Sequence, residues 1–161
     1  MISGLISRLY PACAAPGTQG LPIPDPVHLP RWVERNHSHG TLAAPVDFDP
    51  AADIPTPAYA VAAPVLFAAL LRVGQAQPRC WLAASYPTRL QAHFVMRGAR
   101  LNFPDMVVAE AQPSAQDGGS MAMLFCASVY GRAGSSAGAR RRRLQDFLAA
   151  LDADLATRRE G

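Results

Sequence analysis

The chain has 161 residues, half of them hydrophobic, and a formal charge of +3 at pH 7. A chain of this length and composition buries a core as a single domain, without the metals or disulfides on which shorter chains depend. A dedicated nucleic-acid-binding protein normally has a denser basic face than this charge provides, so no nucleic-acid partner is expected.

The cysteines and the apolar segments bear on the compartment. Cys13, Cys80 and Cys126 lack the spacing of a metal site, and their odd number cannot close completely into disulfides, which favours a reducing compartment. No stretch reaches the roughly 20 apolar residues of a membrane span, and Arg8 and Pro11 interrupt the apolar run of a secretory signal. We expect a cytoplasmic chain or a peripheral membrane contact through Ile2, Leu5, Ile6 and Leu9.

Prolines recur throughout residues 11–57. Each proline removes a backbone donor and restricts the residue before it, so we expect neither a helix nor a central strand in this segment. Residues 1–53 are therefore predicted to form a proline-rich extended arm, and residues 54–161 an α+β domain that folds by itself. The N-terminal arm (residues 1–53) also contains apolar residues, so we expect it to lie against the domain or a partner protein.

Hydrophobic patterns predict regular elements after the arm. Residues 59–62 are predicted to form a short strand, and residues 64–73 a helix that starts at Pro64 and ends at Gly74. Four strands separated by turn-forming residues follow, at residues 80–86, 88–96, 101–112 and 121–130.

Two of these strands show which faces are buried. In the second, Leu90, Ala92, Phe94 and Met96 alternate with the polar residues Arg89, Gln91 and His93, which predicts one buried and one wetter face. The last strand is apolar on both faces and is expected at the centre of the sheet.

The final segment repeats apolar residues at spacings of three and four, which predicts one apolar stripe along a helix, formed by Leu144, Phe147, Leu148, Leu151 and Leu155. The order strand, helix, four strands, helix predicts a single α+β domain. In it, an antiparallel meander sheet packs against a C-terminal helix in a helix-grip-like layout.

Short motifs in residues 59–151 carry a resemblance to a known family. They are Gln77-Pro78-Arg79, the run from Leu90 to Arg97, Phe103-Pro104-Asp105, and Ser128 to Gly131 with Gly138 and Arg143 before a leucine-rich helix. This part resembles domain of unknown function 1499, a family of uncharacterised bacterial proteins. The resemblance supports the domain boundary and implies relatives that are often exported or membrane-associated. Met106 stands where that family often has a second acidic residue.

The strongest polar feature is a glycine-rich turn followed by four arginines. A helix start presents unpaired amides and positive potential, and glycines let a ligand approach, so this segment is a candidate contact for an anion, an acidic partner or a lipid headgroup. Arginines in a first helical turn oppose the macrodipole, so a carboxylate such as Asp105 is expected to compensate Arg143 or a neighbour. The alternative is a solvated basic face. The candidate residues are Gly131, Gly134, Gly138, Arg140, Arg141, Arg142 and Arg143.

Other chemistry has less support. His37 and His39 lack a third ligand, so neither a metal nor a cofactor is expected. Ser128, His93 and Asp105 include the residue types of a hydrolytic triad, but no nucleophile elbow accompanies them. We therefore interpret Asp105 and Ser128 as structural polar residues and predict no catalytic residue.

Together these patterns favour a non-catalytic binding or interaction module whose N-terminal arm contacts a partner protein. The first alternative is a carrier of a small apolar ligand held between sheet and helix. A hydrolase is the least favoured alternative. The apolar pocket of such a carrier would be lined by Phe94, Met96, Phe103, Met123, Phe125 and Phe147.

Overall fold

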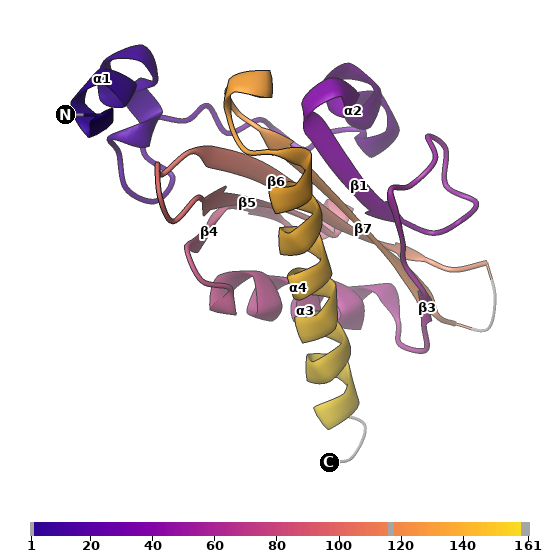
Figure 1. Ribbon diagram of the computed structural model, residues 1–161. Helices are drawn as coiled ribbons and strands as arrows, with labels where there is room; N and C mark the ends of the chain where they lie inside the picture. The colour runs from indigo at the N-terminus through magenta and orange to yellow at the C-terminus, as the bar shows by residue number, and fades with distance from the viewer. Residues whose placement is uncertain (1, 116–117, 159–161) are drawn as a thin grey trace.

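The computed structural model describes residues 2–115 and 118–158 (Figure 1). The helices are α1 (Ile2–Leu9), α2 (Leu29–Asn36), α3 (Ala63–Ala76) and α4 (Ala137–Thr157). The strands are β1 (Gly40–Ala44), β2 (Ile54–Pro55), β3 (Ala58–Tyr59), β4 (Cys80–Tyr86), β5 (Gln91–Arg97), β6 (Pro104–Pro113) and β7 (Ser120–Ser128). Short 3₁₀ turns are η1 (Pro11–Cys13), η2 (His37–His39), η3 (Pro87–Arg89) and η4 (Gly131–Ala133).

One sheet organises the fold, and its strands lie in the order β2-β1-β7-β6-β5-β4. Strands β4 to β7 form an antiparallel meander, as predicted. Strand β7 lies between β6 and β1 and is buried on both faces, which confirms its predicted central place. The α+β architecture with a C-terminal helix on an antiparallel sheet is thus confirmed.

Helices α3 and α4 cover one face of the sheet (Figure 1). The apolar stripe of α4 meets this face through Leu144, Phe147, Leu151 and Leu155, which are all buried, whereas Leu148 is only partly buried at the margin. The sheet supplies Phe94, Val107 and Leu124 to the same core. The aromatic rings of Phe94 and Phe147 meet edge to face with centroids 6.0 Å apart.

Helix α3 continues past the glycine that was expected to end it. Gly74 lies inside the helix. The ring of Phe94 occupies the space next to its Cα, so a Cβ at this position would overlap that ring. The glycine therefore serves close packing between α3 and β5 rather than helix termination.

The expectation that the N-terminal arm holds no helix and no central strand is wrong. Pro30 and Pro45 bound a stretch of the arm that contains no proline. Within it, α2 begins with Pro30 in its first turn, where no donor is lost, and β1 pairs with β7 through residues 40–43. A chain that starts at Ile54 would lack this strand.

The arm also covers the second face of the sheet, which was expected to be wetter. Leu29 and Val33 of α2 pack there against Leu42, Met123 and Phe125. Gln91 and His93 of β5 are completely buried on this face. The Gln91 amide accepts a hydrogen bond from Val27 N and donates one to Val27 O, so the arm satisfies the polar groups that were predicted to face water.

Candidate anion-binding pocket

One end of the sheet gathers the polar residues. Because the strands alternate in direction, β4 and β6 begin at this end and β5 and β7 finish there. The register places Asp105 of β6 opposite both Met96 of β5 and Ser128 of β7. Met96 belongs to the core under α3 and α4, so Asp105 and Ser128 lie on that face, close to the start of α4.

Asp105 is completely buried and paired. It accepts a hydrogen bond from Ser135 Oγ at 2.6 Å and forms an ion pair with Nη1 of Arg143. The expected compensation of Arg143 by Asp105 is therefore confirmed. Burial lowers the pKa of the Arg143 guanidinium, and the nearby positive charge of Arg79 acts in the same direction.

The four consecutive arginines do not form one surface. Helix α4 begins at Ala137 behind the cap Ser136, whose hydroxyl accepts from Ala139 N. Arg140 thus ends the first turn and the other three arginines lie beyond it, so the expected conflict with the helix dipole is small. Arg140 is buried and donates to Ser135 O. Arg141 is exposed and donates to Asp53 O at 3.0 Å, and Arg142 is exposed. Successive residues of a helix point about 100° apart, which disperses the four side chains.

The glycine-rich turn packs against the protein instead of cradling a ligand. A Cβ on Gly134 would overlap the buried Ser128 hydroxyl, so only glycine fits at this position. Gly131 has a φ of 57°, which favours glycine, whereas a Cβ on Gly138 would meet open space. Gly131 and Gly134 therefore support the local backbone, whereas the surroundings of Gly138 do not require a glycine.

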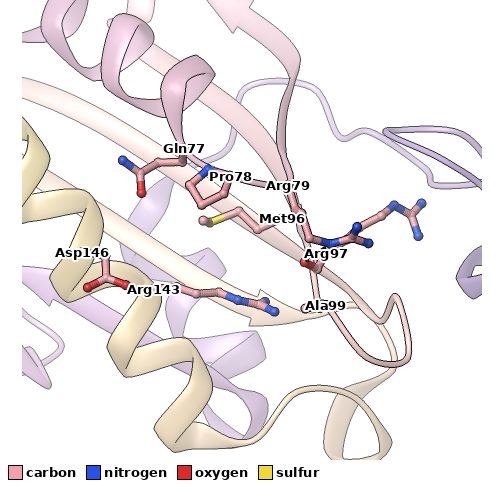
Figure 2. Close-up of a pocket in the computed structure, with 8 residues that line it drawn as sticks. All are labelled: Gln77, Pro78, Arg79, Met96, Arg97, Ala99, Arg143 and Asp146. Carbon is pink, nitrogen blue, oxygen red and sulfur yellow. Dashed lines mark hydrogen bonds between the residues drawn. The ribbon is translucent and has the colours of Figure 1, made fainter.

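A pocket of about 280 Å³ lies beside this cluster (Figure 2). We call it the arginine pocket, and its lining residues are Gln77, Pro78, Arg79, Met96, Arg97, Ala99, Arg143 and Asp146. In Figure 2 the guanidinium of Arg143 reaches from α4 toward Ala99. Its Nη2 atom lies beside Gly98, since a Cβ on that glycine would be 3.5 Å from it.

The other two arginines of the pocket contact the chain around them. Arg97 is only 3% exposed, and its guanidinium donates to the carbonyls of Ala12, Gly17, Gln19 and Asn102. Arg79 is exposed, has a φ of 53°, and donates to Arg97 O and Asn102 Oδ1. No local pattern marks Arg97 as buried, because three of its four acceptors lie about 80 residues away in the arm.

The structure does not bring the predicted apolar pocket together. Phe94, Met96 and Phe147 pack under α3 and α4, whereas Met123 and Phe125 pack on the other face of the sheet against α2. Phe103 stacks edge to face with Tyr10 and Tyr130 outside both cores. The sheet separates these residues, so they cannot line one cavity.

The residues of the possible hydrolytic trio are also apart. Ser128 and Asp105 share one face, but His93 lies on the other, where its Nε2 bonds Gln91 Oε1 at 2.9 Å. Burial raises the pKa of the Cys80 and Cys126 thiols to about 12, which disfavours the nucleophilic thiolate. Within residues 2–115 and 118–158, no three His, Cys, Asp or Glu side chains gather as metal ligands.

The site is therefore a pocket between two helices and a strand turn, lined by arginine, on an α+β scaffold. No protein-family model matches the chain, and a search of curated proteins finds no match either.

Proposed function

We propose that the protein is a non-catalytic binding module that holds a small anion in the arginine pocket. The observation that carries the proposal is the divided role of Arg143. Its Nη1 is engaged by the buried Asp105, while its Nη2 lies by Gly98 at the pocket wall. Asp105 thus fixes a guanidinium whose other edge stays at the pocket wall, where it would bind a carboxylate or phosphate.

The charge balance around the pocket supports an anionic ligand. Arg143 brings a partly desolvated cation to the pocket wall, whereas the guanidinium of Arg97 is directed at carbonyl groups of the arm and that of Arg79 bonds Asn102 Oδ1. Burial lowers the pKa of Arg143, and the nearby positive charge of Arg79 lowers it further. A bound anion would compensate both effects.

The size and polarity of the pocket limit the ligand. A volume of about 280 Å³ is just below the range of about 300 to 1,000 Å³ for small-molecule sites, so it suits a ligand of a few heavy atoms. Asp146 is exposed on α4 and repels an anion, which predicts modest affinity. The Gln77 side chain adds a neutral donor and acceptor at the wall.

Thermal melting of the full chain with phosphate, sulfate or succinate tests the proposal, with chloride at equal ionic strength as reference. A ligand at 100 times its Kd stabilises by about 2.7 kcal/mol, equivalent to a rise of roughly 5 to 10 °C in Tm. Arg79→Gln should weaken binding, and Asp146→Asn should strengthen it. The matched control Arg142→Gln changes an exposed arginine of α4 outside the pocket and should have no effect.

Two results would count against this function. One is a Tm that follows ionic strength alone, whichever anion is present. The other is an equal response of Arg79→Gln, Asp146→Asn and Arg142→Gln, which would indicate general screening of a basic protein. The resemblance to domain of unknown function 1499 stays a prediction beside this proposal, as does a partner protein for the N-terminal arm.

A further inference from the structure

The two ends of the sheet carry opposite charge. At the end where β5 and β7 finish, the connecting segments are residues 10–20, 77–79, 98–103 and 129–136, and none of them contains an aspartate or glutamate. They contain Arg79, Arg100 and Arg132. We call this the basic end. At the opposite end, the segment that leaves β1 holds the exposed Asp47 and Asp49.

Helix α1 is fastened to the basic end by the residues that follow it. The Tyr10 ring meets the rings of Phe103 and Tyr130 edge to face, with centroids 5.3 and 4.8 Å away. The Tyr130 hydroxyl accepts from Ala12 N at 2.8 Å, and the Asn102 amide donates to Cys13 O at 2.8 Å. These contacts hold α1 beside the β5–β6 turn, residues 98–103, as Figure 1 shows.

Large apolar side chains are exposed on these two neighbouring segments. Leu5 and Leu9 are 62% and 65% exposed and lie one turn apart on α1, hence on the same side of the helix. Leu101 in the β5–β6 turn is 43% exposed. Exposed arginines accompany them, Arg8 on α1 and Arg100 next to Leu101.

We propose that the basic end docks on a membrane surface that carries anionic lipid headgroups. Leu5, Leu9 and Leu101 enter the interface, and Arg8 and Arg100 bind phosphate oxygens. Apolar side chains interspersed with cations, on a short amphipathic helix and an adjacent turn, are what an interfacial contact requires. The acidic opposite end orients the molecule by repulsion from the same surface.

The sequence predicted such a contact on α1 alone, and the structure enlarges it. Ile6 is partly buried, and the side chain of Ile2 lies outside the described residues. Leu101, Arg100 and Arg132 come from segments about 90 or more residues further along the chain and share the same end of the sheet. In the part of the chain that the structure describes, no helix is long and apolar enough to cross a membrane.

Co-sedimentation of the full chain with vesicles tests the inference. One vesicle contains phosphatidylcholine alone and the other about 30% phosphatidylglycerol, and binding should require the second and weaken at high salt. The double variant Leu5→Ser/Leu9→Ser should lower the partition coefficient about tenfold or more, and Arg8→Ser/Arg100→Ser should lower it and flatten its salt dependence.

Matched controls come from the opposite end of the sheet. Val46→Ser changes an apolar residue that is 84% exposed, and Arg89→Ser changes an exposed arginine in the turn before β5. Both should bind vesicles like the wild type. Circular dichroism confirms that each variant is folded.

Four results would overturn the inference. The first is equal binding to both vesicles or to neither. The second is an equal loss in the control variants. The third is release of the protein from vesicles by inorganic phosphate at constant ionic strength, which would assign binding to headgroup capture in the arginine pocket. The fourth is dimerisation of the wild type in solution together with a monomeric Leu5→Ser/Leu9→Ser variant, because a second copy of the chain would then cover Leu5, Leu9 and Leu101. The pocket proposal depends on other residues and on soluble anions, so it is unaffected by failure here.

Discussion

Arg97 provides the sharpest test of how the N-terminal arm is attached. Its guanidinium donates to Gly17 O at 2.7 Å, to Ala12 O at 2.6 Å, to Asn102 O at 3.2 Å and to Gln19 O at 3.3 Å. Burial lowers the pKa of Arg97, but an arginine side chain stays charged in a protein. The four carbonyl groups therefore take the place of water around the Arg97 cation. Three of these carbonyls belong to the arm.

We expect Arg97→Ala to destabilise the protein by about 3 to 5 kcal/mol. Each hydrogen bond from a charged donor contributes about 1.5 to 3 kcal/mol, and the four are not additive because water reaches some of the freed carbonyls. Arg97→Lys should be less destabilised than Arg97→Ala, because the ammonium keeps the positive charge. It should still be less stable than the wild type, because an ammonium cannot reach acceptors on different sides. Arg100→Ala is the matched control, because Arg100 is exposed in the turn that follows β5.

Urea denaturation at equilibrium measures the loss, and hydrogen exchange locates it. The amides of Cys13, Ala15 and Gln19 bond within the arm, and their exchange should accelerate most in Arg97→Ala. If the denaturation midpoints of Arg97→Ala and Arg100→Ala coincide, the buried guanidinium does not hold the arm, and our account of its attachment is wrong.

Three further outcomes are expected. Gly74→Ala should destabilise the protein by about 1 to 3 kcal/mol despite the better helix propensity of alanine, because its Cβ meets the Phe94 ring. Gly138→Ala, at an open position of α4, should stabilise it by up to about 1 kcal/mol. The urea midpoints of the two variants should therefore shift in opposite directions from that of the wild type. Burial lowers the pKa of His93, so the unfolded chain binds the proton more readily and stability should fall as pH drops below about 6.5; a His93→Gln variant with the same slope would refute the assignment. Removal of residues 1–53 takes β1 from β7 and α2 from the second core, so thermal melting should lose cooperativity; an unchanged sharp transition would restore the independent domain expected from sequence.

The elements that sequence predicted well have strong periodic signals. The stripe of α4 and one face of each of the four meander strands lie in the core under α3 and α4, and this burial fixes the spacing of their apolar residues. Strand β1 has no such signal, because four of its five residues are buried and two of them are alanine. The prolines on both sides of this region therefore led to the prediction of an extended arm, because the pairing of β1 with β7 exists only in the tertiary structure.

The candidate site was predictable only in part. Pairing of Asp105 with Arg143 followed from charge and from the order of the elements, and it is present. The dispersal of the four arginines was not predicted; it results from the start of α4 at Ala137 and from the rotation of about 100° per helical residue. The pocket itself depends on Arg79 and Arg97, whose surroundings come from distant parts of the chain.

Strand β1 also constrains the order in which the chain folds. Gly40 pairs with Ala127, 87 residues later, so β1 is synthesised long before its partner exists. During that interval Leu42 and its neighbours have no sheet to join, and an unpaired apolar strand tends to pair with other chains. Pro30 and Pro45 keep this segment short, and prolines make poor strand partners. The proline-rich surroundings that concealed β1 in the sequence thus protect it until β7 arrives.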